Sequence, residues 1–66
     1  MKPFIFRNGD EFINLTNALC WRVWESNDGS VILTVEWTRD IKDFVLINAK
    51  SIDSAVYEIL ACWPNN

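Results

Sequence analysis

The side chains that most often carry catalysis or bind metals are scarce in this sequence. It contains no histidine, so it has no imidazole base to activate a serine or cysteine, and it lacks the commonest zinc ligand. Its two cysteines, Cys20 and Cys62, are too few to complete a zinc site. Both glycines fall in expected turns, which leaves none for a phosphate-binding loop. We therefore predict that the protein is not an enzyme and uses no cofactor.

Two pairs of carboxylates are the remaining candidates for metal binding. Asp40 and Asp43, or Asp10 with Glu11, could contribute oxygen ligands to a hard cation. No calcium-loop pattern surrounds either pair, and charges in loops are usually solvated. We interpret them as solvated loop charges and predict no metal site.

Aromatic side chains are abundant for a chain of 66 residues, with four Trp, four Phe and one Tyr. A large aromatic side chain buries about 150–250 Å², whereas a domain of this size buries only roughly 60% of its unfolded surface. We therefore expect some of them on the surface or in a subunit interface. The net charge is −3 and the six Lys and Arg residues never form a run, which argues against nonspecific binding to duplex nucleic acid.

Two hairpins are predicted from turn residues between apolar runs. Asn8-Gly9 suits a two-residue loop, which would pair Arg7 with Asp10 and Ile5 with Phe12. Strand alternation would then gather one apolar face from Phe4, Phe6, Ile13 and Leu15.

Asn27–Gly29 suits a three-residue loop with Gly29 in the left-handed position. That loop would pair Ser26 with Ser30 and Trp24 with Ile32. The resulting apolar face contains Leu19, Trp21, Val23, Leu33, Val35 and Trp37.

Between the hairpins, Thr16-Asn17 interrupts the alternation, and both side chains bond readily to nearby backbone. We expect a bend or bulge that lets one long strand curl over the core; the alternative is two strands separated by a short turn. Residues 38–43 are expected to form a charged loop, and 44–47 a short apolar strand.

A helix is predicted over about residues 52–63, with Ser51 as its N-cap and Asp53 in the first turn. Its apolar stripe is Ile52, Ala55, Val56, Ile59, Leu60 and Trp63, and Pro64 ends it. The predicted fold is α+β: residues 1–66 form a single domain, a four-stranded antiparallel meander sheet packed on one face by the C-terminal helix.

The helix can cover only one face of that sheet, and the other face mixes apolar with polar residues around Trp24 and Ile32. Such a mixture beside an arginine is typical of an interaction surface. We predict a small protein–protein interaction module that forms a homodimer through this face. The predicted interface residues are Ile5, Phe12, Cys20, Arg22, Trp24, Ile32, Thr34 and Glu36.

Single-stranded nucleic acid is the alternative partner. The predicted topology is similar to that of single-strand-binding transcription cofactors that dimerise and bind with a curved sheet. Exposed aromatics beside arginine can stack bases, and the candidates are Arg7, Phe12, Arg22 and Trp24. The run 8–15 also resembles runs in small bacterial or phage proteins of this layout, a likeness too short to imply a function.

The sequence also predicts where the protein resides. Polar residues from Arg7 onward interrupt the apolar start before a signal peptide can form, and no apolar stretch approaches the ~20 residues that span a membrane. We expect a soluble cytoplasmic protein without membrane contact. Cys20 and Cys62 are expected on opposite sides of the sheet as reduced thiols, because a disulfide needs Cα atoms within ~7 Å.

Overall fold

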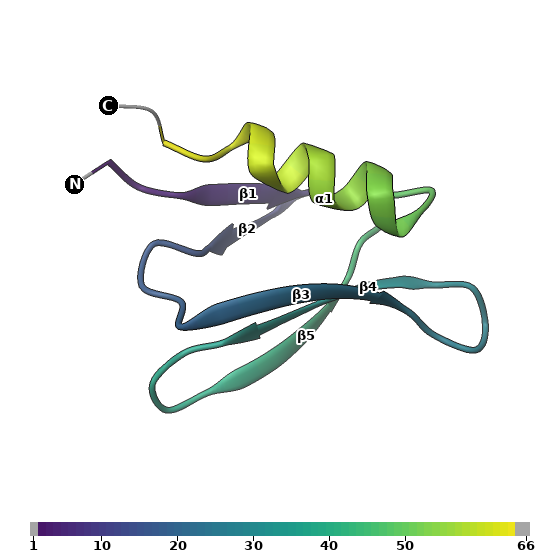
Figure 1. Ribbon diagram of the computed structural model, residues 1–66, viewed down its shortest axis with the longest axis horizontal. Coiled ribbons are helices and arrows are strands. Elements are labelled where there is room, and N and C mark those ends of the chain that lie inside the picture. The colour runs from purple at the N-terminus through teal and green to yellow at the C-terminus, as the bar shows by residue number, and fades with distance from the viewer. Residues whose placement is uncertain (1, 65–66) are drawn as a thin grey trace.

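The computed structural model describes residues 2–64 and has α+β character. Residues 1, 65 and 66 of the predicted domain lie outside this part. The elements follow the chain (Figure 1) in the order β1 (Ile5–Asn8), β2 (Glu11–Asn14), β3 (Cys20–Glu25), β4 (Val31–Glu36), β5 (Ile41–Val45) and α1 (Ile52–Ala61). β1 and β2 form a two-stranded antiparallel sheet, and β3, β4 and β5 form a three-stranded antiparallel sheet with β4 in the centre.

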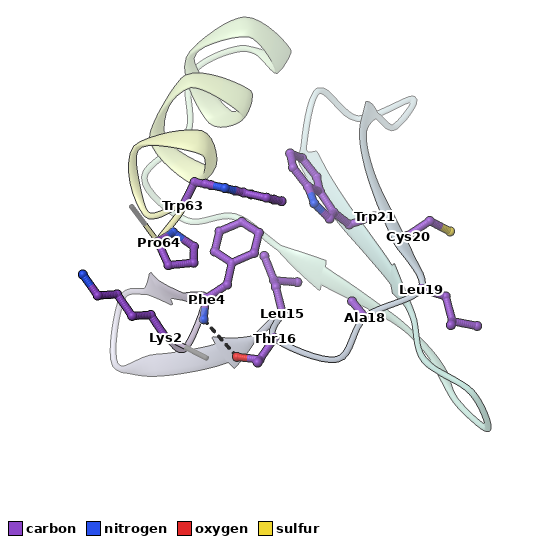
Figure 2. A pocket seen from close by; sticks show the side chains of 10 residues that line it. All are labelled: Lys2, Phe4, Leu15, Thr16, Ala18, Leu19, Cys20, Trp21, Trp63 and Pro64. Carbon is purple, nitrogen blue, oxygen red and sulfur yellow. Dashed lines mark hydrogen bonds between the residues drawn. The ribbon is translucent and has the colours of Figure 1, made fainter. Parts of the chain in front are cut away.

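The prediction of one four-stranded sheet is wrong because the chain turns sharply after β2. The N–H of Thr16 donates to Oδ1 of Asn14 at 2.9 Å, and the N–H of Ala18 donates to the carbonyl of Leu15 at 3.2 Å. The Thr16 hydroxyl accepts from the N–H of Phe4 at 2.9 Å (Figure 2). These bonds close a turn where a curled strand was expected, so the alternative of two separate strands is correct.

The last strand also differs from its prediction. β5 begins at Ile41, inside the segment expected to be a loop, and ends at Val45. The N–H of Trp37 donates to the carbonyl of Asp40 at 2.7 Å. This bond closes a connection between β4 and β5 that is shorter than the predicted loop. Lys42 and Asp43 are exposed within β5. An edge strand tolerates such charges because one of its sides is open to solvent.

The register of the first hairpin is shifted from the predicted one. Asn8 pairs with Glu11 and Arg7 with Phe12, so the loop residues are Gly9 and Asp10. Gly9 has φ 63°, and no other residue type among the described ones has positive φ. Glycine at the first loop position fits a type II′ turn. The shift leaves each side chain on its predicted face, and Phe6 and Ile13 are buried as expected.

The second hairpin has the predicted register. Trp24 pairs with Ile32, and Glu25 with Val31. The N–H of Ser26 donates to the carbonyl of Ser30 at 2.9 Å, and the N–H of Gly29 returns to the carbonyl of Ser26 at 3.0 Å. Gly29 has φ 89°, as its turn position requires.

The predicted helix is also confirmed, with a slightly earlier end. Ser51 caps it: its hydroxyl accepts from the N–H of Ser54 at 3.1 Å, and the Ser54 hydroxyl accepts from the N–H of Ser51 at 3.1 Å. Ala55 and Ile59 are buried, whereas Ile52, Leu60 and Trp63 are largely exposed. The stripe that packs on the sheet is therefore narrower than the sequence indicates.

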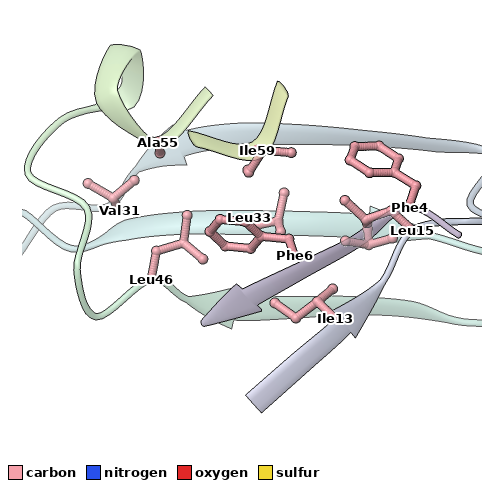
Figure 3. Packing of buried hydrophobic residues seen from close by; sticks show 10 residues of the cluster. Phe4, Phe6, Ile13, Leu15, Val31, Leu33, Leu46, Ala55 and Ile59 are labelled. Carbon is pink, nitrogen blue, oxygen red and sulfur yellow. The ribbon is translucent and has the colours of Figure 1, made fainter. Parts of the chain in front are cut away.

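The core lies between two layers. Figure 1 shows α1 and the β1–β2 hairpin on the same side of the three-stranded sheet. Figure 3 shows side chains of α1, of the β1–β2 hairpin and of the three-stranded sheet meeting between the two layers. The buried cluster comprises Phe4, Phe6, Ile13, Leu15, Val31, Leu33, Val35, Leu46, Ala55 and Ile59. Because both covering elements use one face of the sheet, the opposite face is left without a layer above it.

Candidate functional site

The uncovered face of the three-stranded sheet, termed the outer face below, is ordered in rows across the strands. Strand pairing sets Trp24 beside Ile32 and Ile32 beside Val45, which makes an apolar row. The next row is Arg22, Thr34 and Asp43, and the third is Cys20, Glu36 and Ile41. No helix or strand among residues 2–64 lies over these rows (Figure 1).

A chain of hydrogen bonds crosses the outer face from β3 to β5. Nε1 of Trp24 donates to Oγ1 of Thr34 at 2.8 Å, and the Thr34 hydroxyl donates to Oδ1 of Asp43 at 2.6 Å. Thr34 is buried, so both its donor and its acceptor function are satisfied in place. The chain holds the indole in one orientation on the sheet surface.

The apolar part of the outer face is only partly shielded. Ile32 is 7% exposed because it lies between Trp24 and Val45, whereas Trp24 itself is 37% exposed. Val45 and Ile41, both on the edge strand β5, are more exposed than Trp24. The face therefore presents an aromatic side chain flanked by aliphatic ones, beside a polar row.

The thiol of Cys20 lies on this face. Its Sγ donates to Oε1 of Glu36 at 3.4 Å, and this bond, more than burial or the Glu36 charge, raises the pKa of the Cys20 thiol above 9.0. Nucleophilic cysteines need a lowered pKa, so the setting does not suit catalysis by Cys20. Cys20 and Cys62 are free thiols, as predicted.

The structure brings six of the eight predicted interface residues together and separates the other two. Ile5 and Phe12 belong to the β1–β2 hairpin, whose buried face packs towards the three-stranded sheet, so their own side points away from the outer face. Phe12 is 68% exposed, and the Arg7 guanidinium lies 5.8 Å from its ring centroid. The prediction of one shared face is wrong because it required one continuous sheet. The four candidates for stacking on bases are also divided. Arg7 and Phe12 lie on the β1–β2 hairpin, whereas Arg22 and Trp24 lie on β3.

Sequence reasoning missed three residues of the outer face, namely Ile41, Asp43 and Val45. They alternate with Lys42 and Phe44 at the period of a strand. That alternation was the available signal. The charges led to the prediction of a loop over 38–43, and Val45 lay in the predicted strand 44–47, to which no face was assigned.

No group of three or more His, Cys, Asp or Glu side chains that could hold a metal ion occurs within residues 2–64. No helix in the described part of the chain is long and apolar enough to cross a membrane.

Comparison with known proteins returns no relative. No protein-family model, no curated protein and no solved structure matches this chain.

Proposed function

We propose that this chain is a non-enzymatic protein–protein interaction module that associates with a second copy of itself through the outer face. The observation that carries the proposal is the hydrogen-bonded Trp24 indole at the centre of an uncovered sheet face. Tryptophan is among the residues that contribute most to binding when it fills the centre of an interface. An indole already fixed in the free protein loses little further freedom on binding.

The charges of the outer face suit pairing with an identical face. In a two-fold dimer the same patch meets itself, so it must be complementary to its own copy. The face carries the cationic Arg22 and the carboxylates of Glu36 and Asp43. Each Arg22 can therefore approach a carboxylate of the second copy, which favours one orientation of the dimer.

The size of the molecule also favours self-association. A standard interface buries about 800 Å² per partner, roughly a sixth of the 4950 Å² accessible surface of this chain. Small domains have thin cores, and association is a common way to bury more apolar surface.

The test is the mass in solution by light scattering over a dilution series. We expect the wild type to be a dimer at high concentration, and Trp24→Asp and Val45→Asp to be monomers. Both place a carboxylate in the apolar row, where a dimer would bury it without a partner. The far-ultraviolet circular dichroism of each variant shows whether it is still folded.

Phe12→Asp is the matched control, because Phe12 is an exposed aromatic on the opposite layer. It should remain a dimer. A wild type that is monomeric at high micromolar concentration would rule out self-association. A dimer dissociated by Phe12→Asp but not by Val45→Asp would rule out the outer face as the interface. A single-stranded oligonucleotide added to the same series tests the nucleic-acid alternative, whose binding would weaken steeply with salt.

A further inference from the structure

The three-stranded sheet has two edges, and the β5 edge is blocked by another part of the chain. The carbonyl of Val45 accepts from Nδ2 of Asn8 at 2.8 Å, and the N–H of Ile47 donates to Oδ1 of Asn8 at 3.1 Å. β5 also carries the exposed charges of Lys42 and Asp43, which are typical of protected edge strands. A further strand could pair along β5 only by displacing the Asn8 amide.

The opposite edge, β3, is open. Hydrogen-bonded and non-hydrogen-bonded pairs alternate along an antiparallel ladder. Because the N–H of Ser26 bonds to the carbonyl of Ser30, this alternation directs the backbone groups of Trp21, Val23 and Glu25 away from β4. Within residues 2–64 no hydrogen bond satisfies these outward groups. A row of unpaired N–H and C=O groups is a template for one more β-strand.

An apolar side of α1 lies above this edge, because α1 packs against β3 more than against any other strand. This side comprises Val56, Leu60 and, just beyond the helix end, Trp63, at spacings of four and three residues. Leu60 is 50% and Trp63 is 55% exposed. Figure 2 shows Trp63 extending towards Trp21 of β3. Glu58, on the opposite side of α1, lines a small cavity with residues of β1.

A groove of about 730 Å³ separates Trp21 from Trp63. Side chains on the inner side of a strand added to β3 would point towards this groove and the apolar side of α1, since they alternate as those of β3 do. The other end of β3 is acidic. α1 runs antiparallel to β3 (Figure 1), so its first turn, with Asp53, lies towards Glu25. Both carboxylates are exposed.

We propose that the open edge of β3 binds an extended peptide of another protein as a further antiparallel strand. The peptide backbone bonds to the outward groups of Trp21, Val23 and Glu25, which provides affinity, and alternate side chains provide specificity. The residues opposite Trp21 and Val23 are apolar and pack below the apolar side of α1. The residue opposite Glu25 is basic, because an opposite charge stabilises a cross-strand pair.

A second copy of this chain fits the β3 edge less well than a peptide does. Paired strands lie about 4.7–4.9 Å apart, whereas packed helices need about 8–10 Å between their axes. Because α1 packs on β3 itself, pairing β3 with its own copy would bring the two helices too close. A peptide without a layer of its own meets no such obstacle. The dimer uses the outer face and the peptide uses the edge, so neither proposal depends on the other.

The probe is a set of acetylated heptapeptide amides, Thr-Lys-Thr-X-Thr-X-Thr, in which both X residues are Val, Leu or Phe. Amide hydrogen exchange of the ¹⁵N-labelled protein is measured with and without each peptide. We expect the amides of Trp21, Val23 and Glu25 to exchange rapidly in the free protein and to become protected in the complex. The outward amides of the other edge, at Ile41 and Asp43, should not change.

Two altered peptides separate backbone pairing from side-chain contact. N-methylation at Lys and at both X residues keeps the side chains but removes the donors to the carbonyls of β3. Binding should weaken about tenfold or more, because each lost donor leaves a carbonyl of β3 without its partner. Replacing Lys by Glu should weaken binding about two- to fivefold, through repulsion from Glu25.

Leu60→Glu tests the apolar side of α1. The peptide would cover the new carboxylate without providing a partner for it, so binding should weaken about tenfold. Tyr57→Glu is the matched control on the same helix. Tyr57 is 77% exposed and lies about 100° around the helix from Val56, so this change should weaken binding less than about twofold. Both positions are exposed enough for the fold to tolerate the charge.

Three results would overturn the proposal. The first is no gain in protection at the β3 amides with any peptide of the set, or an equal gain at the β5 amides. The second is equal binding of the N-methylated peptide, or equal losses in Leu60→Glu and Tyr57→Glu. The third is protection of the β3 amides that rises with the concentration of the peptide-free protein, which would assign this edge to a second copy of the chain.

Discussion

The two hairpins of this molecule are closed by the same kind of residue but held by different contacts. Gly9 and Gly29 both have positive φ. In the β3–β4 hairpin the turn is bonded within itself, since Oδ1 of Asp28 accepts from the Ser26 hydroxyl and, at 2.9 Å, from the N–H of Ser30. Every partner lies within residues 26–30, so these bonds do not depend on a distant segment of the chain.

The β1–β2 hairpin depends instead on a distant strand. Nδ2 of Asn8 donates to the carbonyl of Val45 at 2.8 Å, and Oδ1 of Asn8 accepts from the N–H of Ile47 at 3.1 Å. Asn8 is buried as a member of β1 instead of serving as a loop residue. Asn8 therefore does not specify the register as a loop residue, because its side chain bonds to a distant part of the chain.

Among the tests of this difference between the two hairpins, removal of the Asn8 side-chain amide should cause the largest loss of stability. Asn8→Ala should lower the free energy of unfolding by about 1–3 kcal/mol, because two backbone groups lose their partners beside a buried site. Asn27→Ala, in the exposed turn of the other hairpin, should change it by less than about 0.5 kcal/mol. Urea denaturation of both variants measures the two losses. Equal losses would mean that Asn8 is no more than a turn residue.

Replacing Gly9 and Gly29 by alanine separates the cost of backbone strain from the cost of a tertiary contact. Both substitutions should cost about 1–2 kcal/mol through the positive φ. A Cβ on Gly9 would also collide with the end of the Ile47 side chain, whereas a Cβ on Gly29 would meet open space. Gly9→Ala should therefore destabilise only slightly more than Gly29→Ala, because the exposed end of the Ile47 side chain can rotate away.

The same comparison can be made in an Ile47→Ala background, where the collision is removed. There the loss caused by Gly9→Ala should fall to that of Gly29→Ala. An unchanged loss would show that the Ile47 contact contributes nothing to the difference. Thermal or urea unfolding of the four variants measures it.

The smallest expected effect is a pH dependence of the β3–β4 turn. The Ser26 hydroxyl, followed by the N–H of Ser30, lowers the pKa of Asp28 from 3.8 to about 2. A lowered pKa in the folded state stabilises the protein above pH 3.8, and this stabilisation is lost as the pH falls towards about 2. The effect is small because Asp28 is fully exposed.

Asp28→Asn keeps an acceptor oxygen in the turn but does not titrate. Its unfolding free energy should therefore fall less than that of the wild type over this acidic range. Urea denaturation at a series of pH values compares the two. Parallel curves would show that Asp28 does not contribute to acid sensitivity.

The outer face was only partly predictable, for a related reason. Strand alternation in β3 and β4 placed Trp24 beside Ile32 correctly, because the β3–β4 turn fixes their register locally. It could not show that Thr34 would bond to both Trp24 and Asp43, since β5 was expected to begin only at Phe44. Nor could it show that Ile5 and Phe12 lie on a separate sheet, because that depends on how the chain turns at Thr16.

The elements that could be predicted from the sequence are those stabilised by local interactions. The Ser51 cap, the Asn27–Gly29 turn and the alternation of buried residues each depend on residues a few positions apart. Contacts between distant segments set the division into two sheets, the register of the first hairpin and the packing of Trp63 on Phe4. Each of these depends on contacts between segments far apart in the chain, such as Asn8 with Val45 and Phe4 with Trp63. Local patterns favour an element, but only packing determines which of its groups meet a distant partner.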